Sequence, residues 1–126
     1  MTRQLRPREK DAVQLAVRQH LQCRGWRVHR LTSDLRPGVG AHAADREAPG
    51  TPDLLALRND TGPMGVDGAP VWAHARAVYI ECKLTGGKLR PSQRIMHAHL
   101  RAQGYRVLVV EGGDAREAIA SLEAQL

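Results

Sequence analysis

Three side chains have the types and spacing of a site that could cleave phosphodiester bonds. Asp53 begins a short apolar segment, and Glu81 and Lys83 lie two residues apart in a second apolar segment. Side chains two apart in a strand share a face, so Glu81 and Lys83 should project together. If the two segments pair antiparallel, the start of the first lies beside the end of the second, and Asp53 meets Glu81.

This cluster predicts a site for a hard divalent cation. Two neighbouring carboxylates raise one another's pKa unless a cation such as Mg²⁺ or Mn²⁺ takes oxygen ligands from both. Such an ion lowers the pKa of bound water and neutralises charge on a phosphate, while an adjacent lysine orients the water or stabilises the transition state. A Glu-x-Lys strand or a Pro-Asp turn alone usually has only a structural role, so the prediction depends on their joint appearance.

Glu9 is a further acidic candidate. The first predicted helix spans residues 9–23, and Glu9 lies four residues before Val13, so we expect it to share the inward stripe of Val13, Ala16 and Val17. Two interpretations stay open at this point. Glu9 ligates or supports a metal ion, or it complements the positive end of the helix macrodipole.

The remaining pattern predicts a mixed α/β sheet. We expect strands at residues 26–31, 53–58, 71–83 and 105–110, helices at 9–23, 91–104 and 114–126, and loops at 32–50 and 59–70. The second helix should bury Ile95, Met96 and Leu100. Its flanking strands should be parallel, because a helical crossover joins them, and the earlier strands should pair antiparallel.

Composition bounds the class of protein. A chain of 126 residues with 42% hydrophobic and 25% charged residues predicts one folded domain spanning residues 1–126. The net charge of +6 favours a polyanionic partner such as nucleic acid, although a basic surface alone does not require one. Two cysteines, scattered histidines and no long apolar run predict a reduced cytoplasmic protein without structural zinc or a membrane span.

Three motifs together resemble a known family. They are Gly50-Thr51-Pro52-Asp53-Leu54, Tyr79-Ile80-Glu81-Cys82-Lys83 and Gly87-Lys88-Leu89-Arg90-Pro91-Ser92-Gln93. Their order and context resemble the virus-type replication-repair nuclease (VRR-NUC) branch of the PD-(D/E)xK restriction-endonuclease-like superfamily. The resemblance extends from Glu9 to about Val110, nearly the whole chain.

The resemblance implies a restriction-endonuclease-like core, a mixed four-stranded sheet flanked by helices. It also implies a Mg²⁺- or Mn²⁺-dependent endonuclease that acts on branched DNA such as Holliday junctions, as a homodimer, in repair or in defence, in bacteria or phage. The implied metal ligands are Asp53, Glu81, the backbone carbonyl of Cys82 and the first-helix acid Glu9. Lys83 matches the family's lysine, and Gln93 matches the glutamine that lies near it.

One departure affects the end of the second helix that faces this site. The family often has Ser or Thr before the proline of this helix, whereas this chain has Arg90. The uncapped helix N–H groups either bind a phosphate, with Lys88, Arg90 and Arg94 as nucleic-acid contacts, or are capped by water. A non-catalytic nucleic-acid-binding or recruitment module with the same fold is the competing hypothesis, and it predicts binding that ignores divalent ions.

Overall fold

The computed structural model describes residues 5–31 and 49–126. The elements follow the order expected from the sequence: α1 Leu5–Cys23, β1 Arg27–Arg30, β2 Leu54–Thr61, β3 Ala73–Lys83, α2 Pro91–Ala102, β4 Arg106–Glu111 and α3 Ala115–Gln125. Almost all of the loop predicted at residues 32–50 lies outside the described residues. The prediction of a four-stranded α/β fold with three helices is therefore confirmed.

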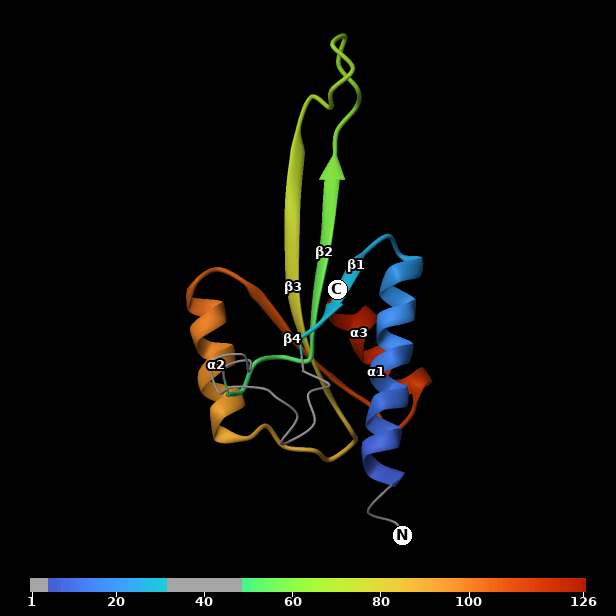
Figure 1. Ribbon diagram of the computed structural model, residues 1–126, viewed down its shortest axis with the longest axis vertical. Coiled ribbons are helices and arrows are strands. Elements are labelled where there is room, and N and C mark those ends of the chain that lie inside the picture. Colours follow the sequence, from blue (N-terminus) through green and yellow to red (C-terminus); the bar gives the residue numbers. More distant parts are fainter. Residues whose placement is uncertain (1–4, 32–48) are drawn as a thin grey trace, which may run out of the picture.

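The four strands form one mixed sheet in the order β1-β2-β3-β4. β1 and β2 pair antiparallel, β2 and β3 pair antiparallel, and β3 and β4 pair parallel across α2, as predicted. In the central pair Leu54 lies opposite Ile80, which in turn lies beside Leu108 of β4. Figure 1 shows α2 on one side of the sheet and α1 and α3 together on the other.

The apolar core lies between the sheet and the helices α1 and α3. Side chains alternate along β3, so Val78, Ile80 and Cys82 point into this core. Glu81 and Lys83 point to the opposite face of the sheet, toward α2. Burying this apolar surface is the main stabilising term of the fold. The core residues on the helices and on the other strands are Val13, Val17, Leu21, Trp26, Leu54, Ala56, Leu108, Val110, Ala118 and Leu122.

The β2–β3 hairpin differs from the prediction at its far end. β2 continues to Thr61 instead of ending at Arg58, whereas β3 begins at Ala73, two residues later than predicted, and Thr61 pairs with Ala73. Figure 1 shows this hairpin projecting well beyond the helices. We call residues 59–75 the arm. It exposes four large apolar side chains, namely Met64, Val66, Val71 and Trp72.

A cluster of charged and aromatic side chains fixes the base of the arm. The guanidinium groups of Arg58 and Arg76 each lie 5.1 Å from the ring centre of the buried Trp26. Asp60 accepts from Arg58 at 3.0 Å and from Arg76 at 3.4 Å. The two neighbouring arginines are thus held by one carboxylate between them, and they join β2 and β3 to the core.

The predicted inward face of α2 was wrong in part, because Leu100 is buried as expected but Ile95 is not and Met96 is only half-buried. Ile95 is 71% exposed, and the buried side chains are Gln93, His97 and Leu100. These three residues share one side of the helix by their spacing of four and three. The inward face is polar because α2 covers the part of the sheet where Glu81 and Lys83 project.

Candidate active site

The sheet register brings the two predicted acids together. Leu54 pairs with Ile80, so the preceding Asp53 lies beside Glu81 at the edge of the antiparallel pair. Both side chains are buried, with 3% and 0% of their surface exposed. Cys82 N donates to Asp53 Oδ2 at 2.9 Å, and this hydrogen bond fastens the carboxylate of Asp53 to β3. The expected meeting of Asp53 and Glu81 is therefore present.

Glu81 is perturbed by its buried position and by the neighbouring acid. Burial first, and then the negative charge of Asp53, raises the pKa of Glu81 to about 8. Glu81 Oε2 is buried and has no hydrogen-bond partner within the described residues. A pair of buried acids with one unpartnered oxygen is a site that a divalent cation would stabilise.

The backbone of Cys82 faces the same site. Lys83 O accepts from Gly112 N at 3.0 Å on the β4 side, so the polar groups of Cys82, one residue earlier, face β2. The N–H of Cys82 already donates to Asp53, and its carbonyl points to the same side. Its thiol lies in the core, where burial raises the thiol pKa to about 12.

Lys83 is held at the site by Gln93. Lys83 Nζ donates to Gln93 Oε1 at 2.9 Å, and Arg90 N donates to the same oxygen at 2.8 Å. Burial lowers the pKa of Lys83, and the charge of Glu81 opposes that effect. The predicted neighbours Lys83 and Gln93 are thus in direct contact, beside the two acids.

The expected inward position of Glu9 was wrong. Glu9 is exposed, and Lys10 instead points to the site, with its Nζ 3.7 Å from Asp53 Oδ2. The reason is helical phase: Val17 is fully buried, and the residue two turns before it is Lys10. Across residues 5–31 and 49–126, no three His, Cys, Asp or Glu side chains gather as a metal-ligand group.

Sequence reasoning missed two residues of this site, Lys10 and His97. His97 Nε2 lies 3.3 Å from Glu81 Oε1, and both side chains are only 1% exposed. The signal for His97 was its spacing of four from Gln93, which places both on one face of α2. This spacing predicts a buried His97 only if Gln93 is already known to face the sheet.

Exposed basic residues surround the N-terminal end of α2. Lys88, Arg90 and Arg94 are all exposed. Arg90 occupies the N-cap position, and its side chain makes no capping hydrogen bond because a guanidinium has no acceptor. Gln93 supplies only the reciprocal bond, to Arg90 N. The positive end of this helix therefore points to the same region as three basic side chains.

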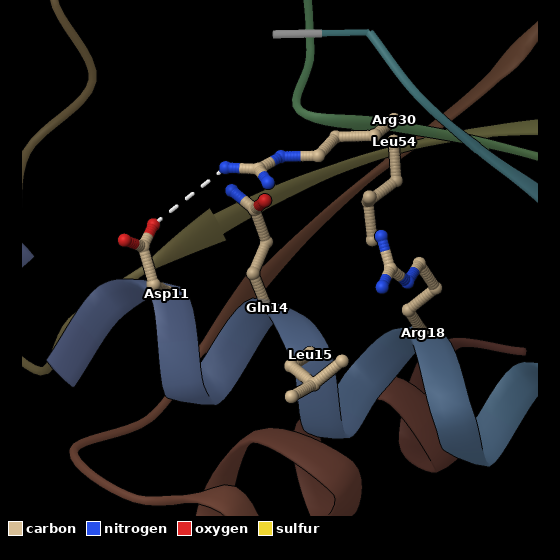
Figure 2. A pocket seen from close by; sticks show the side chains of 6 residues that line it. All are labelled: Asp11, Gln14, Leu15, Arg18, Arg30 and Leu54. Carbon is tan, nitrogen blue, oxygen red and sulfur yellow. Dashed lines mark ion pairs between the residues drawn. The ribbon is translucent and has the colours of Figure 1, made fainter. Parts of the chain in front are cut away.

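A separate hollow of about 250 Å³ lies on the opposite face of the sheet. Figure 2 shows it between α1 and the start of β2, with the ion pair of Arg30 and Asp11 at its rim. It adjoins the core side of Leu54, whereas Asp53 and Glu81 face α2. The hollow is therefore distinct from the acid cluster. Its remaining lining residues are Gln14, Leu15 and Arg18.

Together, the fold and the clustered acids and lysine define an α/β domain of the nuclease type. The sequence profile of the VRR-NUC domain matches residues 3–114, and the chain belongs to this family. A solved structure described as a VRR_NUC domain shares the fold, with a TM-score of 0.57 and 20% identity over 94% of this chain and 98% of that chain. No curated protein matches the chain. Within the part of the chain that the structure describes, no helix is both long and apolar enough to span a bilayer.

Proposed function

We propose that this protein is a metal-dependent endonuclease that hydrolyses DNA phosphodiester bonds and selects branched DNA such as Holliday junctions. The observation that carries the proposal is the buried pair of Asp53 and Glu81, with an unpartnered carboxylate oxygen and Lys83 alongside. Membership of the VRR-NUC family supports the nuclease chemistry. The preference for branched DNA is inferred from the family resemblance.

The donor set fits Mg²⁺ or Mn²⁺. These ions take oxygen ligands and usually keep several waters, so two carboxylates and one backbone carbonyl are sufficient protein ligands. Asp53, Glu81 and the carbonyl of Cys82 would hold the ion. When bound, it would supply an activated water and neutralise charge on the phosphate. Glu9 is not part of this proposed set, because its side chain is exposed while Lys10 occupies the position beside Asp53.

The basic side chains near the acids provide the positive charge that a phosphodiester substrate needs. Gln93 fixes the Lys83 ammonium near Glu81, where it can donate to a non-bridging phosphate oxygen or to the attacking water. Lys10 partly neutralises Asp53 and lowers the pKa of Glu81 from the other side. We propose that Lys88, Arg90 and Arg94 contact neighbouring phosphates of the DNA strand.

A non-catalytic DNA-binding module with this fold is the alternative. Nothing in phosphate binding needs two buried acids, which repel the DNA backbone and are costly to bury unpaired. Such a module would be more stable if either acid were replaced by a neutral side chain. The retained pair therefore favours catalysis.

Cleavage of a panel of DNA substrates tests the proposal. The panel holds a four-way junction, a flap and a linear duplex, each with Mg²⁺, Mn²⁺ or EDTA. We expect cleavage of the branched substrates only with the metal ions. Asp53→Asn, Glu81→Gln and Lys83→Met should each lower the rate by about a hundredfold or more. Junction binding by Asp53→Asn in Ca²⁺ should stay within a few-fold of wild type.

Arg116→Gln is the matched control, because it removes an exposed positive charge on α3, on the other side of the sheet. It should cut like the wild type. Cleavage that persists in EDTA, or that survives both Asp53→Asn and Lys83→Met, would refute the assignment of the site. Binding without cleavage under every condition would favour the alternative.

We also propose that the protein acts as a homodimer through the arm. Monomeric proteins rarely expose a cluster of large apolar side chains such as Met64, Val66, Val71 and Trp72. The only charged residues between 59 and 75 are Asp60 and Asp67, in a chain of net charge +6. Asp60 is paired with Arg58 and Arg76, so the arm is apolar, carries the charge of Asp67 and has no Lys or Arg to attract DNA. Its apolar side chains can pack against a second copy. A dimer would also present two sites to a branched substrate.

A further inference from the structure

His97 is the one buried histidine among the described residues, and it contacts an acid of the proposed site. It lies one turn after Gln93 on the inward face of α2, with Nε2 3.3 Å from Glu81 Oε1. Its Nδ1 is buried and has no hydrogen-bond partner in the described part of the chain. The ring therefore makes its one described hydrogen bond to the carboxylate of Glu81.

The contact defines the roles of both groups when Glu81 is ionised. An ionised carboxylate only accepts, so His97 Nε2 carries the proton and donates it to Oε1. This bond runs from the helix to the carboxylate whether or not Nδ1 also carries a hydrogen.

One oxygen of Glu81 is occupied by this bond and the other is not. Oε1 faces His97, whereas Oε2 is buried and unpartnered on the same carboxylate. Rotation of the carboxylate would exchange the two oxygens, and the hydrogen bond from the helix opposes that rotation. His97 therefore selects which lone pairs of Glu81 are free to bind a cation.

We propose that His97 is a positioning residue, which holds Glu81 so that Oε2 is presented to the divalent ion. This inference rests on the proposed function, because it concerns the same metal site. Hydrogen bonds to ligating groups orient them, and losing one typically weakens metal binding about 10–100-fold. A histidine that merely filled space would not matter in this way.

The test uses three substitutions that differ in where they place a donor. His97→Gln puts an amide N–H near the position of Nε2, His97→Asn reaches only the position of Nδ1, and His97→Leu has no donor. The readout is Mn²⁺ binding to the full chain without DNA, by calorimetry and by the electron paramagnetic resonance signal of free Mn²⁺. Thermal unfolding of each variant confirms that it folds.

We expect His97→Leu and His97→Asn to weaken Mn²⁺ binding about 10–100-fold, and His97→Gln to stay within a few-fold of wild type. High Mn²⁺ should restore much of the DNA cleavage that His97→Leu loses. If His97→Leu fails to fold, the Mn²⁺ affinities of His97→Gln and His97→Asn are compared instead. Equal affinities of these two variants would contradict the positioning role.

Two failures are distinguishable. In the first, the wild type binds Mn²⁺ and cuts DNA, and His97→Leu or His97→Asn binds Mn²⁺ as tightly as the wild type. This result would overturn the role of His97 and leave the nuclease proposal standing. Wild type that takes up no Mn²⁺ would overturn the metal site and this inference together.

Discussion

Lys83 and Gln93 are joined by a hydrogen bond of 2.9 Å that links the end of β3 to the first turn of α2. The same oxygen of Gln93 accepts from Arg90 N at 2.8 Å, so a single carbonyl group binds the backbone of the N-cap residue and holds a candidate catalytic lysine. This bond fixes the backbone of Arg90, whose own side chain cannot cap the helix. It also makes the start of α2 part of the site.

Removing that oxygen should therefore affect both stability and activity. Gln93→Met keeps the length of the side chain and removes the acceptor, which leaves Lys83 Nζ and Arg90 N without their partner. We expect a loss of about 1–3 kcal/mol in the free energy of unfolding by urea and about a tenfold lower cleavage rate. Gln93→Glu retains an acceptor for both donors and should be much closer to wild type in stability. Equal effects of the two substitutions would contradict the dual role.

The meeting of the acids was predictable from the sequence because it depends on strand geometry alone. Antiparallel pairing puts the start of one strand beside the end of the next, whatever the length of the connection between them. The alternation of side chains then fixes Glu81 and Lys83 on one face. Asp53, Glu81 and Lys83 could thus be placed together without any knowledge of the helices.

The helical contributions were not predictable in the same way. On α1, Glu9 and Lys10 differ by one residue, and apolar residues at both Ala16 and Val17 left the phase of the inward stripe ambiguous. On α2, a rule based on apolar residues selected Ile95, which is exposed. The inward residues Gln93 and His97 are polar because their partners are Lys83 and Glu81, and those partners belong to another element.

The arm was misread for a different reason. Glycine and proline are frequent between residues 59 and 70, and this composition is typical of a loop. β2 nevertheless extends into this segment as far as Thr61, and a further isolated bridge joins Met64 to Pro70. Pairing between strands stabilises this segment, which local propensity alone does not predict.

Gly50 sets the approach of Asp53 to α2, and substituting it tests that role. Its φ is +83°, and a Cβ there would lie 2.1 Å from Ser92 O. Gly50→Ala should therefore unfold at lower urea and lose activity, because the turn carrying Asp53 must move away from α2. Gly104→Ala is the matched control, since Gly104 has φ +95° and nothing within 4 Å. It should cost only about 1–2 kcal/mol and leave cleavage unchanged. A Gly50→Ala variant that behaves like Gly104→Ala would refute the steric argument.

Charge introduced at the tip of the arm should separate the proposed dimer. Val66→Glu combined with Met64→Glu places two acids where the apolar contact is expected, and desolvating them would oppose association. Light scattering should give a dimer for wild type and a monomer for the double variant. Leu15→Glu is the control, because Leu15 is an exposed apolar residue of α1 and is not part of the arm. It should remain dimeric. Wild type that is monomeric, or a double variant that stays dimeric, would rule out this interface.

The raised pKa of Glu81 predicts how stability without metal depends on pH. The folded protein keeps the Glu81 proton up to about pH 8, whereas the unfolded chain releases it near 4.5. Between these values the folded state binds more protons, so the free energy of unfolding contributed by this group falls as pH rises. This contribution to stability is fully present below about pH 4.5 and is lost by about pH 8. In EDTA we expect wild type to lose at least about 1 kcal/mol across this window.

Three comparisons assign that loss to the acid pair. Glu81→Gln cannot ionise and should remove most of the slope, and Asp53→Asn should reduce it because Asp53 contributes to the shift. Glu9→Gln is the matched control, since Glu9 is exposed, and its profile should follow wild type. Mg²⁺ or Mn²⁺ favours the ionised pair, so either ion should stabilise wild type more at about pH 8 than at about pH 5. A wild-type profile in EDTA that is flat across the window would mean that the two carboxylates do not share a buried site.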